Sequence, residues 1–270
     1  ARETRNTYRL GAYLRPRSVK GLKVNTWYRY RTDDDPAYAT TVANGHEGFA
    51  SLTLAPGGRW GGTLNGRLAW EENNERAISQ TNAASTQTEY HVDRRRLLSN
   101  LGAGVWTTVK DSVHLSLNYG YFRTRIVQDL VFGQDTANLL TLEDEDVQYV
   151  QQVHTATAAA SWRIAEALTA LFEGHYSRSR AAYDPDFATT MDFPLADPDP
   201  PLTLPVDSSG LKEVSKLDIQ QFGLQAGLDW SPEENWTCSA RYRYDDYNDN
   251  LSGLFEGSSQ TVTVTLARAW

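Results

Sequence analysis

The sequence contains a single cysteine, Cys238, among 270 residues. One cysteine cannot form an intrachain disulfide, and it excludes a metal cluster held by several thiolates. The haem-attachment motif CxxCH is therefore absent too, so the chain attaches no c-type haem of its own. These absences predict that the chain binds no cofactor and no metal.

Long apolar runs are also missing. Hydrophobic residues make up 40% of the chain, the mean hydropathy is −0.54, and no run approaches the ~20 apolar residues of a membrane-spanning helix. A membrane location is then compatible only with β-strands, in which every second side chain faces lipid. Positive charge is scarce as well: the net charge of −8 argues against a nucleic acid partner.

What is present is a strict alternation of side-chain type, clearest in residues 259–270, SQTVTVTLARAW. Val262, Val264, Leu266 and Trp270 share one face of an extended strand, and threonines occupy the other. A strand of this kind with a final aromatic residue resembles the closing strand of Gram-negative outer-membrane β-barrels. Arg268 is the one departure from that pattern.

The same alternation recurs along the chain and predicts an all-β, antiparallel up-and-down transmembrane barrel. We expect strands of roughly 10–13 residues, joined alternately by short turns and by long polar loops at 33–45, 73–86, 128–146, 180–216 and 245–258. A soluble β-sandwich also alternates, but it does not predict this rhythm. Eleven strands are expected: 8–15, 22–31, 47–55, 60–71, 97–105, 113–121, 148–162, 168–176, 222–230, 236–244 and 259–270.

Aromatic residues sort by position along these strands, which is typical of the two interfacial girdles of a membrane barrel. Tryptophans next to short turns predict one girdle: Trp60, Trp162, Trp230, Trp236 and Trp270. Aromatic residues toward the long loops predict the other: Tyr28, Tyr30, Trp70, Tyr119, Tyr121, Tyr176, Tyr242 and Tyr244.

The odd strand number has a consequence for closure. Bacterial single-chain barrels normally have an even number of strands. An open edge in lipid would leave backbone groups unpaired. We therefore expect residues 1–270 to be one barrel domain that is incomplete at its N-terminus, the C-terminal part of a larger even-stranded barrel, or a barrel with a strand supplied from elsewhere. A miscounted segment around residues 89–109 is the rival explanation.

The opposite face of the strands is polar and carries more positive than negative charge, which predicts a basic wall lining the lumen. Fixed positive charge in a pore would favour anions. The alternative is a network of salt bridges with no role in selectivity, and the sequence does not separate the two. The predicted wall consists of Arg9, Arg15, Lys23, Arg29, Arg31, Arg67, Arg241 and Arg243.

Acidic clusters and histidines offer weaker candidates. Runs at 33–35, 143–146 and 245–249 match no calcium-loop template and are expected to be solvated loop charge. His114 and His175 are predicted to face the lumen from different strands, and no catalytic motif surrounds them. The sequence predicts no catalytic residues and no enzyme.

A further resemblance rests on two hairpins, LDWSPEENWTCSARYRYDDYND at 228–249 and SWRIAEALTALFEGHYSRS at 161–179. In each, a tryptophan and a short charged turn precede a strand rich in tyrosine and arginine. This resembles the MtrB/PioB-type outer-membrane barrels of electron conduits. The resemblance implies a sheath that houses a multihaem cytochrome in its lumen. The N-terminal cysteine pair frequent in that family is absent from residues 1–270.

The expected location is the bacterial outer membrane, with outer-membrane lipid as the surrounding partner. A porin-like channel with a polar-lined pore is the first functional hypothesis. A cytochrome sheath for electron transfer is the second. A structural or adhesive barrel that acts through its extracellular loops is the third.

Overall fold

The computed structural model describes residues 4–34, 41–81, 87–133, 141–184, 190–193, 202–205, 215–233, 235–254 and 256–268, with the backbone alone at 75–81, 87–91, 131–133, 141–144, 190–193 and 202–205. All regular elements of this part are strands, as predicted. They are β1 (Arg5–Leu14), β2 (Leu22–Asp33), β3 (Asn44–Leu54), β4 (Trp60–Thr81), β5 (Gln87–Val109), β6 (Val113–Gly133), β7 (Thr141–Ala165), β8 (Leu168–Asp184), β9 (Thr190–Phe193), β10 (Leu202–Pro205), β11 (Leu217–Glu233), β12 (Trp236–Asp249) and β13 (Gly257–Arg268).

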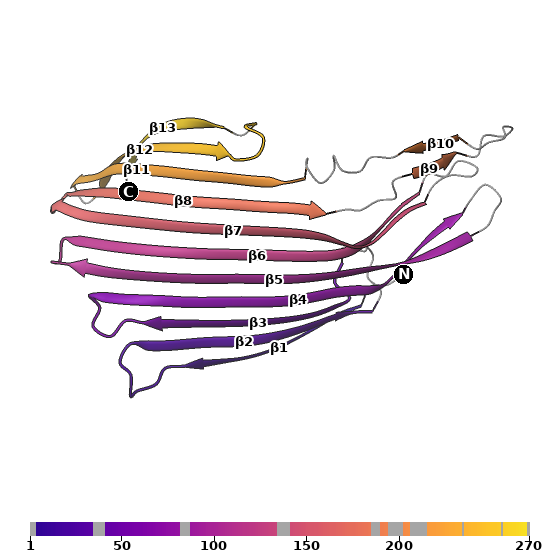
Figure 1. The fold of residues 1–270 in the computed structure, drawn as a ribbon. Helices are drawn as coiled ribbons and strands as arrows, with labels where there is room; N and C mark the ends of the chain where they lie inside the picture. The colour runs from indigo at the N-terminus through magenta and orange to yellow at the C-terminus, as the bar shows by residue number, and fades with distance from the viewer. Residues whose placement is uncertain are drawn as a thin grey trace.

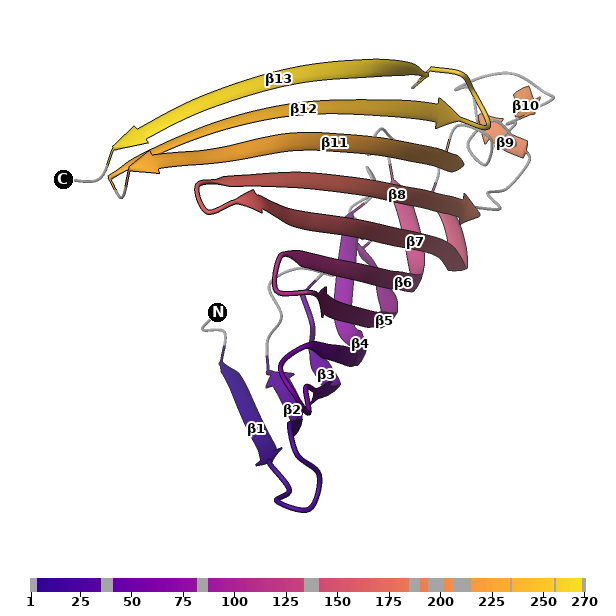
Figure 2. The same cartoon turned by 90° about the vertical axis from the view of Figure 1, so that its left-hand side faces the viewer.

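Eleven of the strands form one continuous antiparallel sheet, each paired with its neighbour in the order β1 to β8 followed by β11, β12 and β13 (Figure 1). This confirms the predicted up-and-down arrangement and the strand count. The sheet curves into an open trough, with β1 and β13 at its two edges (Figure 2). Among the described residues, β1 pairs only with β2, and β13 only with β12.

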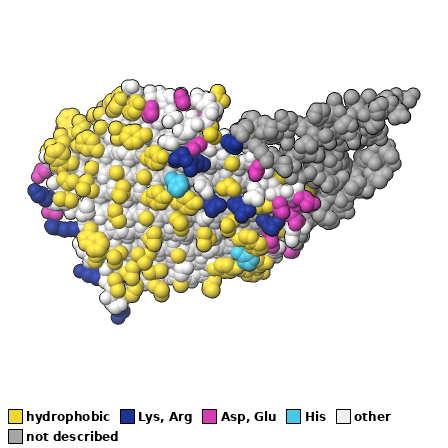
Figure 3. All heavy atoms as spheres, viewed as in Figure 1, with side chains coloured by type: hydrophobic (Ala, Val, Ile, Leu, Met, Phe, Trp, Pro, Cys, Tyr) yellow, Lys and Arg dark blue, Asp and Glu magenta, His cyan; other side chains and the backbone are white. Residues whose placement is uncertain are grey.

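The two faces of the trough differ in chemistry. Figure 3 looks onto the convex side, where hydrophobic side chains cover most of the strands. Large apolar side chains there are open to the surroundings, for example Leu64, Leu117, Phe172 and Leu224. Nearly all the buried side chains lie on the concave side, where curvature brings neighbouring strands together. The described residues contain no helix long and apolar enough to cross a membrane.

Strand lengths depart from the prediction. Strands β4 to β7 have 21 to 25 residues each, so most of the expected loops at 73–86 and 128–146 are paired strand. A polar sequence does not prevent strand pairing, because the backbone supplies the hydrogen bonds of the ladder. The ladders shift register at two bulges, between Asn73 and Arg76 and between Gln128 and Leu130. Both bulges lie beyond the apolar band, toward the long-loop end of the strands.

The expected loop at 180–216 is likewise not entirely irregular. Strand β8 continues to Asp184, and residues 190–193 and 202–205 pair as the separate two-stranded sheet β9–β10. At the opposite end of the trough the connections are short, as expected. In the first of them Gly21 has a φ of 77° and accepts a hydrogen bond from the Ala55 amide, where a side chain would collide with the Ala55 carbonyl.

Candidate functional site

The predicted aromatic residues all project from the convex face wherever their side chains are described. Trp60, Trp162 and Trp230 lie near the short turns and are about half exposed, at 51%, 49% and 51%. The tyrosines and Trp70 lie toward the opposite end of the same strands. Trp270 lies outside the described residues. The two sets bracket the apolar band, which is the arrangement expected of interfacial aromatic residues.

Two histidines join the second aromatic set, which sequence reasoning did not foresee. His46 lies between Tyr30 and Trp70, with ring centroids 5.0 and 5.5 Å away, and its Nδ1 is 2.5 Å from the Tyr28 hydroxyl. In the same way, the Nδ1 atom of His154 lies 2.8 Å from the Tyr119 hydroxyl. Both histidines are amphipathic rings that lie in the same row as the tyrosines and Trp70.

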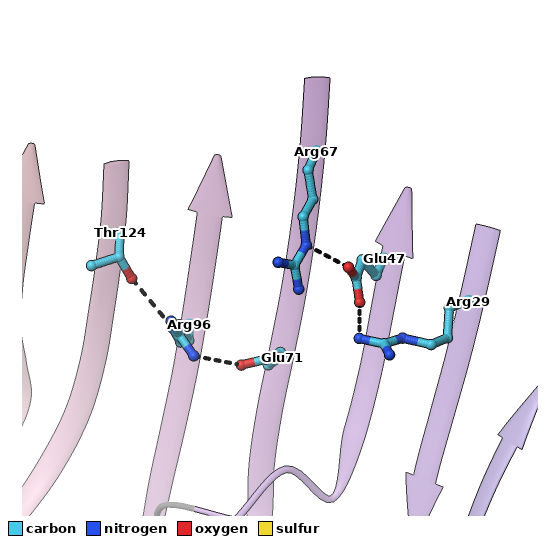
Figure 4. A network of polar contacts seen from close by, with 6 residues as sticks. All are labelled: Arg29, Glu47, Arg67, Glu71, Arg96 and Thr124. Atoms are coloured by element: carbon cyan, nitrogen blue, oxygen red, sulfur yellow. Dashed lines mark hydrogen bonds and ion pairs between the residues drawn. The ribbon is translucent and has the colours of Figure 1, made fainter. Parts of the chain in front are cut away.

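The concave face carries charged networks that cross several strands. Glu47 on β3 lies between Arg29 on β2 and Arg67 on β4, and it accepts a hydrogen bond from each (Figure 4). The Glu47 side chain is only 7% exposed. One strand further on, Arg96 of β5 donates to Glu71 of β4 at 3.2 Å and to Thr124 of β6 at 3.3 Å. Charged side chains on four consecutive strands, β2 to β5, are therefore held against one another.

A second cluster lies on the concave face of β8, β11 and β12. Asp245 accepts hydrogen bonds from Arg243 at 2.6 Å and Gln221 at 3.0 Å, and its Oδ1 is 2.9 Å from His175 Nε2. Gly223 lies between His175 and Asp245, where a Cβ would collide with both side chains. Cross-strand register alone brings these groups together, so no local motif could have revealed them.

The predicted basic wall is thus partly neutralised. Arg29 and Arg67 pair with Glu47, Arg241 with Asp229 at 2.6 Å, and Arg243 with Asp245. Arg9 instead lies 4.4 Å from the Trp27 ring centroid.

Lys23 and Arg31 lie on the concave face of β2, and no carboxylate partner is seen for either among the described residues. Arg15 follows the last residue of β1 and so lies outside the strand in which it was expected. Basic residues with and without a carboxylate partner among the described residues therefore lie on the same face.

The acidic clusters are not simply solvated, contrary to the prediction. Asp33 is buried and accepts a hydrogen bond from Arg5 at 3.2 Å, and Asp245 is buried in the cluster above. Asp249 accepts the backbone N–H groups of Leu251 and Ser252 and closes the turn after β12. Asp35 lies outside the described residues. Within the described part of the chain, no group of three or more histidine, cysteine or acidic residues could hold a metal ion.

Asp218 forms an outward-facing cluster with Arg178 and Arg180, beyond the apolar band of β8 and β11. Arg178 donates to both carboxylate oxygens, at 2.9 and 2.8 Å, and Arg180 donates at 3.1 Å. The bidentate Arg178 contact lowers the pKa of Asp218 from 3.8 to about 2.

This shift predicts how folding stability depends on pH. The folded pKa is depressed, so the contribution of Asp218 is complete above its unfolded pKa of 3.8 and is lost as the pH falls through about 2. Urea unfolding of the wild type should therefore show a loss of stability between these two values that Asp218→Asn lacks. If both proteins lost the same free energy of unfolding over this pH range, the result would contradict the prediction.

Comparison with known proteins identifies the fold and nothing finer. No family model matches the sequence, and no curated protein matches it. Among solved structures, the siderophore receptor PirA from Acinetobacter baumannii is 12% identical, with a TM-score of 0.60 over 99% of this chain and 38% of that one. The ferric yersiniabactin uptake receptor FyuA from Yersinia pestis is 13% identical, with a TM-score of 0.58 over 96% of this chain and 40% of that one.

A third similar structure, the siderophore receptor PiuA from Acinetobacter baumannii, is 8% identical, with a TM-score of 0.56 over 96% of this chain and 44% of that one. The chain thus spans about two-fifths of the length of the structures that it matches. It has the fold of outer-membrane β-barrels, and an outer-membrane location follows from this fold and the apolar convex face.

Proposed function

We propose that the sheet is one wall of a wide, water-lined barrel through which hydrophilic solutes cross the outer membrane. The observation that carries the proposal is the chemistry of the concave face. Charged and polar side chains line it from β2 to β12 and satisfy one another across strands. A packed protein core would be apolar, whereas a polar interior is typical of barrels that contain water or a polar occupant.

Closure of this barrel requires strands beyond the described sheet. The edge strands β1 and β13 both run from the long-loop end to the short-turn end. The direction reverses from each strand of the eleven to the next, and an even number of reversals leaves the first and last strands parallel. A second copy inserted in the same direction would therefore meet β13 with a parallel strand. We propose that an odd number of further strands completes an all-antiparallel barrel. These strands would pair the backbone groups of both edges, which are costly to leave unpaired in hydrocarbon.

The balance of charge supports a weak preference for anions. Four of the eight residues of the predicted wall have carboxylate partners and add little net field. Arg9, Lys23 and Arg31 sit on neighbouring strands at one side of the trough, where a positive field would persist. The region of the lumen expected to favour anions is therefore the β1–β2 side and not the whole wall.

The conductance of the complete protein in a planar bilayer tests the proposal. We expect stable ion conductance with a reversal potential shifted toward anions, and Lys23→Glu/Arg31→Glu should reverse the shift. Arg17→Glu at the short-turn end is the matched control and should leave the sign unchanged.

Two other outcomes favour the rival functions. A closed lumen together with a haem absorbance spectrum would favour the cytochrome sheath, to which the hairpin at 228–249 is similar. A closed lumen without haem would favour a structural barrel.

A further inference from the structure

Arginine residues follow the aromatic belt on the convex face of three strands. On β6 the outward side chains run from Leu117 through two tyrosines to Arg123 and Arg125. On β8, Tyr176 is followed by Arg178 and Arg180. On β5, Leu97 is followed by Arg95. Figure 3 shows several basic side chains on the half of the convex face toward the long-loop end.

A hollow of about 370 Å³ opens beside two of these arginines, Arg95 and Arg125. Its lining includes Trp70 and Leu97 from the edge of the apolar band, and Arg95, Arg125, Asp146 and Gln148 from beyond it. A second, apolar hollow of about 730 Å³ lies across β1 to β5, bordered by Leu68, Leu101, Tyr28 and Gly66. Both hollows have lining residues on β4 and β5, where Leu68 and Leu101 of the apolar one lie nearer the short turns than Trp70 and Leu97 of the polar one.

The arginines around the polar hollow are only partly neutralised. Arg95 pairs with Asp146 at 2.8 Å and lies opposite Glu72 in the ladder. Arg125 donates to the neutral Gln148 amide at 3.0 Å. Arg123 is exposed, and no carboxylate partner is seen for it among the described residues. The lining of the hollow contains three arginines, Arg95, Arg96 and Arg125, and one carboxylate, Asp146.

The geometry points to a binding site for the phosphorylated headgroup of a membrane lipid, with Arg95, Arg123 and Arg125 as its ligands. Guanidinium groups donate two parallel hydrogen bonds to phosphate oxygens. The headgroup would occupy the hollow between Arg95 and Arg125, and an acyl chain would extend past Leu97 and Leu101 toward the apolar hollow on the neighbouring strands. Basic side chains at this depth meet lipid phosphates because they sit at the boundary between hydrocarbon and water. The site goes beyond the proposed pore and does not depend on its being open.

Lipid binding to the complete protein in detergent provides the test. The probes are lipid A, an acylated glucosamine disaccharide with two phosphates, and the same lipid after removal of its phosphates, with bound lipid counted by native mass spectrometry. The wild type should bind the phosphorylated lipid about tenfold more tightly. Arg123→Gln/Arg125→Gln should abolish this preference. Arg17→Gln/Arg163→Gln removes the same charge at the short-turn end and should retain it.

Three results would overturn the inference. The first is an equal affinity of the wild type for the two lipids, a measurement that depends on no variant. The second is an unchanged preference in the Arg123/Arg125 variant, provided that heat-dependent gel mobility shows it folded. The third is displacement of the lipid by inorganic phosphate, which would assign the arginines to a soluble anion. Conductance is a separate measurement, so the pore proposal and the lipid site can fail independently.

Discussion

Leu117→Arg is expected to destabilise the membrane-embedded protein by about 2–4 kcal/mol. Leu117 lies in the apolar part of β6 between the two aromatic sets, and its side chain is 54% exposed on the convex face. Its register partners Val105 and Ala158 are also apolar, so an arginine there would meet apolar neighbours and hydrocarbon. The cost arises because a guanidinium in hydrocarbon loses its hydration without gaining a partner. Urea unfolding in phospholipid vesicles, followed by tryptophan fluorescence, measures it.

Ser116→Arg is the matched control, because it places the same side chain one residue away on the opposite face. Ser116 borders a concave hollow that also includes Glu173. An arginine there reaches the polar interior, where a carboxylate can compensate it, so a cost below about 1 kcal/mol is expected for a water-accessible charge. Equal costs at the two positions, or a larger cost at Ser116, would contradict the assignment of the convex face to lipid.

The facing of the strands could be predicted from the sequence because side-chain direction in a strand has a period of two. Knowing that Leu115, Leu117 and Tyr119 share a face requires no knowledge of any other strand. The same local rule placed Arg29 and Arg67 on the concave side before any register was known. Strand number and the alternating turns follow from the same pattern.

The extent of the strands could not be predicted, because alternation of polar and apolar residues ends where the apolar band ends. Beyond that level both faces meet water, and pairing depends on the partner strand. The hairpin β4–β5 remains paired as far as Thr81 and Gln87 even though its sequence there is mostly polar. A sequence criterion based on hydrophobicity therefore detects the membrane-crossing part of a strand and misses its extension.

The contacts of the concave face were hidden for a different reason. His175 and Asp245 come from β8 and β12 and meet across β11 only because the registers of two ladders coincide. Such coincidence has no signature in either segment alone. For this reason the sequence offered a salt-bridge network only as an alternative to the basic wall, and the pairings with Glu47, Asp229 and Asp245 could not be predicted.

Glu47→Gln is the second large effect, with an expected loss of about 2–3 kcal/mol in the free energy of unfolding. The substitution preserves the shape of the side chain and removes its charge. Arg29 and Arg67 would then face each other across β3 without a counter-charge. Their side chains are 36% and 43% exposed, so water screens part of the repulsion and keeps the cost below that of a fully buried triad.

The control for Glu47 is Asp111→Asn, which breaks an ion pair with Arg59 at the short-turn end. Both side chains there are open to water, at 92% and 74%, so a loss below about 0.5 kcal/mol is expected. Adding Arg67→Gln to Glu47→Gln should restore part of the stability, because one of the two opposed charges is then gone. A Glu47→Gln variant as stable as Asp111→Asn would mean that water, and not Glu47, balances the arginines. The concave face would then be an open solvent surface, and its positive field would extend to Arg29 and Arg67 as well as the β1–β2 side.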